Sequence, residues 1–140
     1  MARDDQRLGL PKESTIASNA VLERPRPFDL DVMAEDGRVD AKKLAGAIDV
    51  TLTQLAQILE VKPKNLTESP TGRKLQEPAM KLVAMMNDVA EYVQDKRYAL
   101  YWLRTPRREL GDRTALDWLM QGKLDEIRDH VSRVVDLQPD

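Results

Sequence analysis

The 140-residue chain contains no cysteine and only one histidine, His130. The missing cysteines exclude disulfide bonds, zinc sites built on thiolates and cysteine nucleophiles. A single histidine leaves little room for a histidine-based metal centre or for a serine–histidine–aspartate triad. We therefore predict that the chain is not an enzyme and that it has no catalytic residues, no metal site and no cofactor.

Long apolar runs and glycine-rich runs are also missing. No stretch of the sequence is apolar for long enough to cross a bilayer. The first residues, MARDDQRLGLPKE, lack the apolar core of a secretory signal. The six glycines never form a run that could hold a phosphate group. These absences predict a cytoplasmic protein that has no membrane partner.

The formal net charge of −2 hides an uneven distribution along the chain. Residues 1–37 carry 5 basic and 8 acidic side chains, residues 38–74 carry 7 and 4, and residues 75–140 carry 10 and 12. A basic segment inside an acidic protein indicates an anionic partner. The excess is much smaller than on a strong nucleic-acid-binding surface, and solvated helix faces explain the charge pattern at least as well.

The first 37 residues are interrupted by three prolines and show no sustained helical period. A short helix fits residues 18–23, and the alternation of Phe28, Leu30 and Val32 predicts an extended segment. We interpret this region as an N-terminal arm, which either docks on the core through Phe28 and Leu30 or stays mobile.

The next segment, residues 38–76, carries clear helix start signals. Asp40 is placed to cap one helix, and Thr51 with Gln54 forms a capping box at the start of a second. Proline is favoured in the first turn of a helix, so a third helix is predicted over Pro63–Glu68, where Pro70 soon ends it. The three helices predict a compact helical module.

Residues 77–140 form the third predicted unit, and they are helical throughout. Pro78 is expected to open the longest helix, which runs to about Gln94. Its broad apolar stripe indicates burial on two sides, as in the centre of a domain or of a dimer. Further helices are predicted over residues 98–104, 115–121 and 123–136, and no strand pattern is present. The predicted fold class is therefore all-α, a helical bundle.

The helices at 51–59 and 63–68 have the spacing of a helix-turn-helix. In that motif the start of the second helix enters the major groove, where Asn can read adenine and Lys can reach guanine or a phosphate. Basic residues beside the groove would bind phosphates. The candidate DNA-binding residues are Lys62, Lys64, Asn65, Thr67, Arg73 and Lys74.

Two features argue against DNA binding by this module. Glu60 occupies the turn position that is usually glycine, and it places a carboxylate near the expected phosphates. Pro70 keeps the second helix short. The alternative is a helical hairpin that has the shape of a DNA-binding motif without the activity.

The most distinctive stretch runs from Trp102 to Leu119 and reads WLRTPRRELGDRTALDWL. A Trp-Leu pair ends one helix and Pro106 stops it. A Leu-Gly bend at Gly111 follows, and Thr114 starts the next helix. This pattern predicts a rigid corner that fixes the angle between two helices, with Trp102 in the core.

This spacing resembles the toxin-binding domain of the Xre/MbcA/ParS antitoxin family. The matching positions are Trp102, Leu103, Pro106, Leu110, Gly111, Leu116 and Leu119. The resemblance extends over residues 38–137, because members of the family place an Xre-like helix-turn-helix before this domain. The chain departs from the common pattern at Arg107, where many members have Asn, and at Ala115, where a second proline is common.

The resemblance implies an antitoxin of a type II toxin–antitoxin system. Its partner would be a RES-type toxin that consumes NAD, and the carboxy-terminal region of the antitoxin would cover the toxin's NAD entrance. The antitoxin would form a homodimer, a hetero-oligomer with the toxin, and a complex with operator DNA that represses its own operon. By position, the expected toxin-binding residues are Arg104, Arg107, Arg108, Trp118, Arg133, Leu137 and Gln138.

Other classes of protein fit the sequence less completely. One alternative is a helix-turn-helix transcriptional repressor whose carboxy-terminal domain only dimerises, and another is a family member without a toxin partner. Ordinary solvation could also explain the arginines. The best catalytic candidates are Asp125, Asp129 and His130, but the two aspartates are spaced for surface ion pairs with Arg128 and Arg133.

Overall fold

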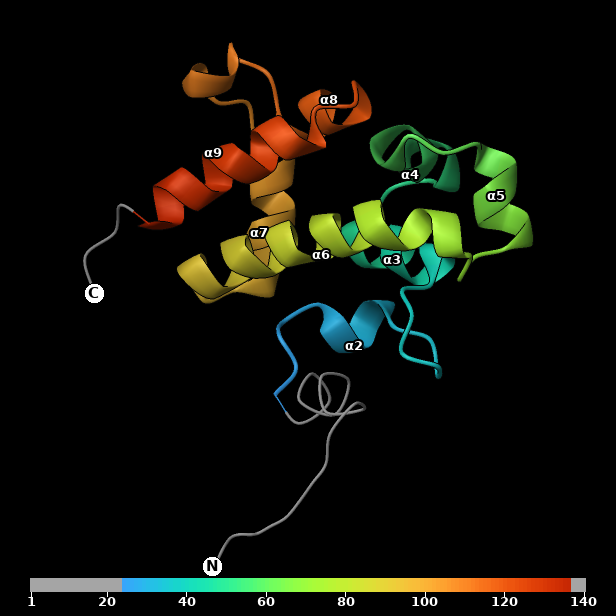
Figure 1. Ribbon diagram of the computed structural model, residues 1–140. Coiled ribbons are helices and arrows are strands. Elements are labelled where there is room, and N and C mark those ends of the chain that lie inside the picture. Colours follow the sequence, from blue (N-terminus) through green and yellow to red (C-terminus); the bar gives the residue numbers. More distant parts are fainter. Residues whose placement is uncertain (1–23, 137–140) are drawn as a thin grey trace, which may run out of the picture.

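The computed structural model describes residues 24–136, and this part of the chain is helical without a single strand (Figure 1). The helices are α2 (Asp29–Val32), α3 (Ala41–Ile48), α4 (Leu52–Leu59), α5 (Pro63–Glu68), α6 (Arg73–Val93), α7 (Lys96–Leu103), the 3₁₀ helix η1 (Arg108–Leu110), α8 (Ala115–Met120) and α9 (Leu124–Asp136). The prediction of an all-α helical bundle is confirmed. The helix predicted over 18–23 lies outside the described residues.

Side-chain caps start the helices where the sequence predicts them. The side chain of Asp40 accepts hydrogen bonds from the first backbone N–H groups of α3. Thr51 and Gln54 form a reciprocal capping box with distances of 3.0 and 2.9 Å. A second capping box joins Thr114 and Asp117 at the start of α8. These caps fix where each short helix begins, so the connecting turns are also fixed.

The prediction that Pro78 opens the longest helix is wrong. Helix α6 begins at Arg73, and Pro78 lies inside it, where proline removes one backbone hydrogen bond of the helix. Tertiary contacts hold the additional turn. Leu75 is buried, and the Gln76 amide nitrogen donates to the carbonyl groups of Val39 and Gly72 at 2.9 and 3.2 Å.

The N-terminal segment and α7 also differ from the sequence interpretation. The expected extended segment is instead the one-turn helix α2. Phe28 is only 1% exposed and docks as expected, but Leu30 is 61% exposed and points away from the core. Helix α7 begins two residues earlier than predicted because Asp95 caps it. A one-turn helix and an aspartate cap are both decided by local contacts that apolar periodicity does not reveal.

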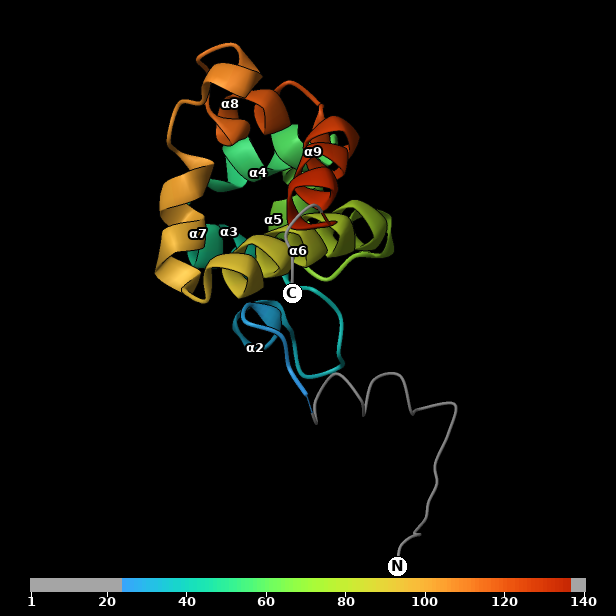
Figure 2. The same cartoon turned by 90° about the vertical axis from the view of Figure 1, so that its left-hand side faces the viewer.

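Helix α6 lies in the middle of the fold. In both views it runs between α9 on one side and α2 on the other (Figures 1 and 2). Its strongest packing partners are α7 and α9, and α4 also touches it. Its buried residues are Leu75, Ala79, Leu82, Val83, Met85, Met86, Asn87, Val89 and Ala90. The predicted burial on two sides is thus achieved within one chain.

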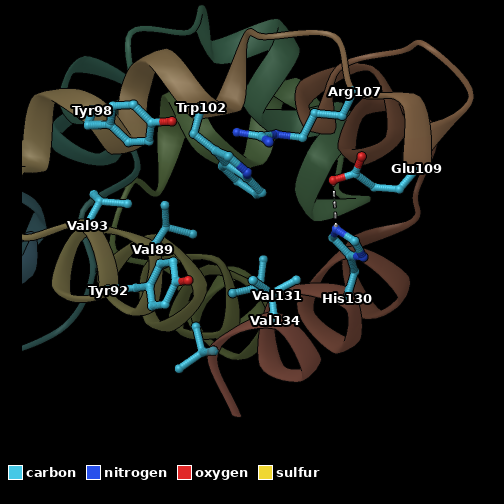
Figure 3. Close-up of a pocket in the computed structure, with 11 residues that line it drawn as sticks. Val89, Tyr92, Val93, Tyr98, Trp102, Arg107, Glu109, His130, Val131 and Val134 are labelled. Atoms are coloured by element: carbon cyan, nitrogen blue, oxygen red, sulfur yellow. Dashed lines mark ion pairs between the residues drawn. The ribbon is translucent and has the colours of Figure 1, made fainter. Parts of the chain in front are cut away.

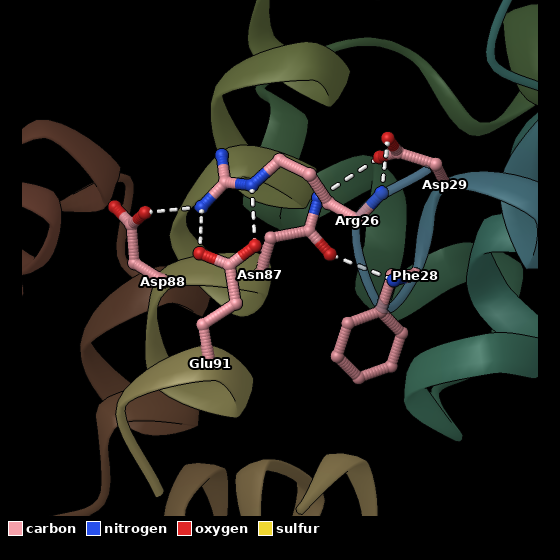
Figure 4. Close-up of polar contacts among 6 residues, drawn as sticks. All are labelled: Arg26, Phe28, Asp29, Asn87, Asp88 and Glu91. Atoms are coloured by element: carbon pink, nitrogen blue, oxygen red, sulfur yellow. Dashed lines mark hydrogen bonds and ion pairs between the residues drawn. The ribbon is translucent and has the colours of Figure 1, made fainter. Parts of the chain in front are cut away.

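Asn87 is a buried polar residue of α6, and it attaches the start of α2 to α6 (Figure 4). Its side-chain oxygen accepts a hydrogen bond of 2.7 Å from the Phe28 backbone N–H. Its side-chain nitrogen donates to the Asp29 carboxylate at 2.9 Å. A buried amide is tolerated when its donors and acceptors are paired. The segment that contains Phe28 therefore belongs to the core.

An ion-pair cluster on the surface reinforces this attachment (Figure 4). The guanidinium group of Arg26 donates two hydrogen bonds to Glu91, at 2.9 and 2.8 Å, and one to Asp88, at 2.6 Å. The hydrogen bonds from Arg26 hold the pKa of Glu91 below its ordinary value. The same contacts raise the pKa of Arg26.

The lowered pKa of Glu91 predicts a pH-dependent contribution to stability. Stabilisation is fully present above the unfolded-state pKa of about 4.3 and is lost as the pH falls through the lower folded-state value. Because both side chains are substantially exposed, Glu91→Gln should reduce the free energy of unfolding by only about 0.2–1 kcal/mol near neutral pH. Urea denaturation near pH 7 and near pH 3 measures this difference, which should disappear in acid. Glu77→Gln, on the same helix, is the control for the loss of an exposed carboxylate that has no ion pair among residues 24–136.

Candidate functional site

The corner between α7 and α8 is closed by its own backbone. The Arg107 N–H donates to the Arg113 carbonyl at 3.1 Å, and the Asp112 N–H donates back to the Arg107 carbonyl at 2.9 Å. Gly111 ends η1 with φ of 71°, a left-handed conformation that favours glycine. The indole N–H of Trp118 donates to the Leu110 carbonyl at 2.9 Å. The predicted rigid corner is confirmed.

Each of the two tryptophans in this region carries an arginine on its ring. The guanidinium carbon of Arg107 lies 5.8 Å from the ring centre of Trp102, and that of Arg113 lies 5.9 Å from the ring centre of Trp118. These are cation–π distances. Trp102 is 8% exposed and belongs to the core, as its place in the sequence predicts.

A pocket of ≈ 270 Å³ opens between α6, α7, η1 and α9 (Figure 3). Valines from α6 and α9 line its apolar side, and Tyr98 and Trp102 enter from α7. Its polar end holds Arg107, Glu109 and His130. Glu109 pairs with His130 across 3.9 Å, so a carboxylate and an imidazole close that end.

The residues expected to bind a toxin are distributed around this pocket and corner. Arg107 lines the pocket, Arg108 is exposed beside it on η1, and Trp118 is half-buried on α8. Arg133 is exposed on α9, where it pairs with Asp129. Leu137 and Gln138 lie outside the described residues. The structure thus brings Arg107 and Arg108 together and leaves Trp118 and Arg133 on neighbouring helices.

Arg104, another expected toxin-binding residue, makes its contacts within the chain. Its guanidinium group donates to the Ile48 carbonyl at 2.9 Å, to the Asp49 carbonyl, and to the Leu100 carbonyl at 3.4 Å. Ile48 and Asp49 form the carboxy-terminal end of α3, where carbonyl groups lack partners within the helix. A cation there also complements the helix dipole. Arg104 therefore joins α7 to α3, a role that no sequence pattern signals.

The candidate DNA-binding residues lie at the amino-terminal ends of α5 and α6, except Thr67, which is near the carboxy-terminal end of α5. Lys62, Lys64, Thr67, Arg73 and Lys74 are exposed and Asn65 is half-buried. Neither helix has a side-chain hydrogen bond at its N-cap. Basic side chains at such ends oppose the helix dipole, whereas a bound anion would complement it.

The carboxylate of Glu60, which was expected near DNA phosphates, makes a close contact within the chain. It lies against Gly122, and a Cβ at Gly122 would collide with it. Glu60 itself ends α4 in the left-handed conformation, with φ of 59°. This contact joins the end of α4 to the turn between α8 and α9.

Surface ion pairs use the carboxylates that sequence analysis named as catalytic candidates. Asp125 lies 3.8 Å from Arg128, and it also lies 3.6 Å from Lys81. Asp129 pairs with Arg133. Among residues 24–136, no three His, Asp or Glu side chains are grouped to hold a metal ion. No helix in the same part of the chain is long and apolar enough to cross a membrane.

Residues 88–134 match the model of the antitoxin Xre/MbcA/ParS C-terminal toxin-binding domain. This part of the chain is similar to the toxin-binding domain of the Xre/MbcA/ParS antitoxin family. The matched segment runs from the last turns of α6 to near the end of α9, so it contains the corner and every residue that lines the pocket except Val135. It is about a third of the chain, and α3, α4 and α5 lie outside it. No curated protein matches the chain significantly.

This match supports an antitoxin role for the chain. Several residues that match the family pattern in the sequence are buried or shape the backbone in the structure. Leu103, Leu110 and Leu119 are buried, and Gly111 makes the bend. At the two departures from the common pattern, Ala115 is buried in α8 and Arg107 lies over Trp102.

The contacts of Arg104 predict a stability role that can be measured. Arg104→Met should lower the free energy of unfolding by about 1–3 kcal/mol, because the carbonyl groups at the end of α3 lose their donors. Urea denaturation checks this. Arg97→Met on the same helix removes a side chain that is 93% exposed and should change stability by less than about 0.5 kcal/mol. Equal effects of the two substitutions would contradict the role of Arg104.

Proposed function

We propose that this chain is the antitoxin of a type II toxin–antitoxin system and that it blocks a RES-type toxin that consumes NAD. The observation that carries the proposal is the match of residues 88–134 to a toxin-binding domain. That segment contains the pocket and the closed corner. The family resemblance supplies the RES type, the NAD substrate and the occlusion mechanism, and these are proposals for this chain.

The surface of the toxin-binding domain has the composition of a protein interface. The chain has three tyrosines, and all of them are on α6 or α7: Tyr92 and Tyr98 are each 41% exposed and Tyr101 is 63% exposed. The rings of Tyr98 and Tyr101 lie 5.8 Å apart. Tyr, Trp and Arg are the residue types that most often dominate binding energy. An aromatic surface beside Arg107 and Arg108 therefore supports docking of a partner protein.

To cover the toxin's NAD entrance, the antitoxin needs a rigid binding surface but no catalytic activity of its own. The corner supplies rigidity, because its backbone bridge, the Trp118 hydrogen bond and the α8 capping box fix the position of η1. A preorganised surface loses little conformational entropy when it binds. We place the toxin on this surface, with Arg107, Arg108 and Trp118 at its centre and Arg133, Leu137 and Gln138 towards the toxin's NAD entrance. Arg104 would act indirectly, by holding α7.

The proposal predicts that the chain abolishes NAD loss catalysed by the RES-type protein of the adjacent gene. Arg108→Glu should weaken the complex by about tenfold or more, since it reverses an exposed charge at the proposed interface. Isothermal titration and an NAD consumption assay measure the two effects. Lys42→Glu, an exposed change on α3, is the control and should bind normally. Continued NAD consumption at saturating amounts of the wild-type chain would rule out this role.

We also propose that α5 and the start of α6 bind operator DNA, so that the chain, as a homodimer or with its toxin, represses its own operon. The supporting observation is that exposed Lys and Arg side chains lie at two helix ends without side-chain caps. The carboxylate of Glu60 lies against Gly122, in the turn between α8 and α9. If DNA binding were the only activity, the chain would be a helix-turn-helix transcriptional repressor whose carboxy-terminal domain only dimerises.

DNA binding predicts a mobility shift with the DNA upstream of the gene, and the shift should weaken as salt concentration rises. Lys64→Ala should cost about 1–3 kcal/mol of binding free energy if Lys64 contacts a base. Lys42→Ala removes an equal charge from α3 and should have a smaller effect. Identical behaviour of the wild-type and Lys64→Ala proteins would remove the assignment of α5 as the recognition helix.

A further inference from the structure

The guanidinium group of Arg107 lacks an acceptor in the described structure. Its Nε atom is buried and makes no hydrogen bond. None of the ion pairs found within residues 24–136 includes this side chain. Roughly nine in ten buried polar groups in proteins are paired, so an orphaned donor calls for an explanation.

A cation–π contact with Trp102 positions this guanidinium group without giving its N–H groups an acceptor. The guanidinium carbon lies over the Trp102 ring, 5.8 Å from the ring centre. The N–H donors of arginine lie in the guanidinium plane and project from its edge. Cation–π contact therefore fixes the orientation of Arg107 and leaves the donors available to an acceptor.

The nearest acidic residue along the chain does not serve as that acceptor. Glu109 lines the same pocket, and its carboxylate is directed to His130 at 3.9 Å (Figure 3). No hydrogen bond or ion pair found within residues 24–136 joins Glu109 to Arg107. The pocket thus presents an arginine without a counter-ion beside valine side chains.

The size and lining of the pocket limit what can enter. Its volume of ≈ 270 Å³ is below the range of about 300–1,000 Å³ that is usual for sites of whole small-molecule ligands. Val89, Val131 and Val134 would contact methylene groups, and Arg107 would pair with a charged end. Tyr92 and Tyr98, both half-exposed, flank the opening and would exclude water around an inserted group.

We propose that this pocket receives one acidic side chain, an aspartate or a glutamate, from the toxin, and that its carboxylate pairs with Arg107. The inference rests on the proposed function, and it specifies a carboxylate as the group on the toxin that enters the pocket. Arginine pairs with a carboxylate through two parallel N–H bonds, which fixes the geometry as well as the charge of the partner. The cation–π contact with Trp102 positions the Arg107 guanidinium group for that pairing in the free chain.

The test compares toxin binding by the wild-type chain, Arg107→Met and Arg107→Lys in isothermal titration with the RES-type protein of the adjacent gene. Arg107→Met should weaken binding at least tenfold, and Arg107→Lys should weaken it less, because lysine keeps the charge but not the planar pair of donors. Lys42→Met is the control, because Lys42 is exposed on α3 and does not line the pocket.

Thermal unfolding of the free variants separates binding from folding. An unpaired guanidinium contributes little to the fold, so Arg107→Met should leave the Tm of the free chain unchanged or raise it. A lowered Tm together with normal binding would show that Arg107 is structural and would overturn the proposal.

A further variant that lacks residues 137–140 tests whether the chain's own carboxy-terminal residues occupy the pocket. If Arg107→Met no longer weakens toxin binding when residues 137–140 are absent, the proposal is also overturned.

Substitution of the toxin's acidic residues completes the test. Each acidic residue is changed to its amide, and one of them should show strong coupling to Arg107→Met in a double-mutant cycle. If the wild-type chain binds the toxin but no acidic residue is coupled to Arg107, this inference fails while the proposed function stands. If the wild-type chain does not bind the toxin at all, the proposed function fails and this inference fails with it.

Discussion

The fold depends on one constraint, which is that α6 must bury apolar side chains on more than one side. Helices α7 and α9 cover it on one side, and the segment before α3 covers it on another. Asn87 makes the second attachment specific, because its amide pairs with both Phe28 and Asp29. The toxin-binding domain therefore shares its central helix with a segment that precedes α3. The division of the chain at residue 76 or 77 remains a prediction.

Two contacts then fix the helix-turn-helix-like module to the toxin-binding domain. Arg104 reaches from α7 to the carbonyl groups at the end of α3, and Glu60 reaches from the end of α4 to Gly122. Helices α4 and α8 also pack directly on each other. The basic residues around α5 are consequently held at a fixed position relative to the pocket. A toxin bound at the corner and DNA bound at α5 would therefore be rigidly placed with respect to one another.

Much of the fold could be predicted because short-range chemistry decides it. The Asp40 cap, the Thr51 capping box, the Thr114 cap and the bend at Gly111 are visible in the sequence and are confirmed. The start of α6 could not be predicted in the same way. Proline normally marks the first turn of a helix, and only the packing of Leu75 and Gln76 shows that another turn precedes Pro78.

The site was predictable only in part for a similar reason. The sequence indicated that Arg107 and Arg108 matter, but the pocket beside them is formed by α6, α7, η1 and α9 together. The exposed surface formed by Tyr92, Tyr98 and Tyr101 could not be predicted either. All three tyrosines lie within ten residues, but sequence spacing alone does not distinguish an exposed helix face from a buried one. The acceptors of Arg104 are backbone carbonyl groups about 55 residues away, which leave no mark in a sequence pattern.

The central claim is that the toxin docks on the corner and pocket of the toxin-binding domain. Amide hydrogen exchange of the chain, alone and with the protein of the adjacent gene, tests it most directly. The account predicts slower exchange in α7, η1, α8 and α9 on complex formation, with α3 and α5 unchanged. Protection confined to α3, α5 and the start of α6, with none around Arg107, would contradict it.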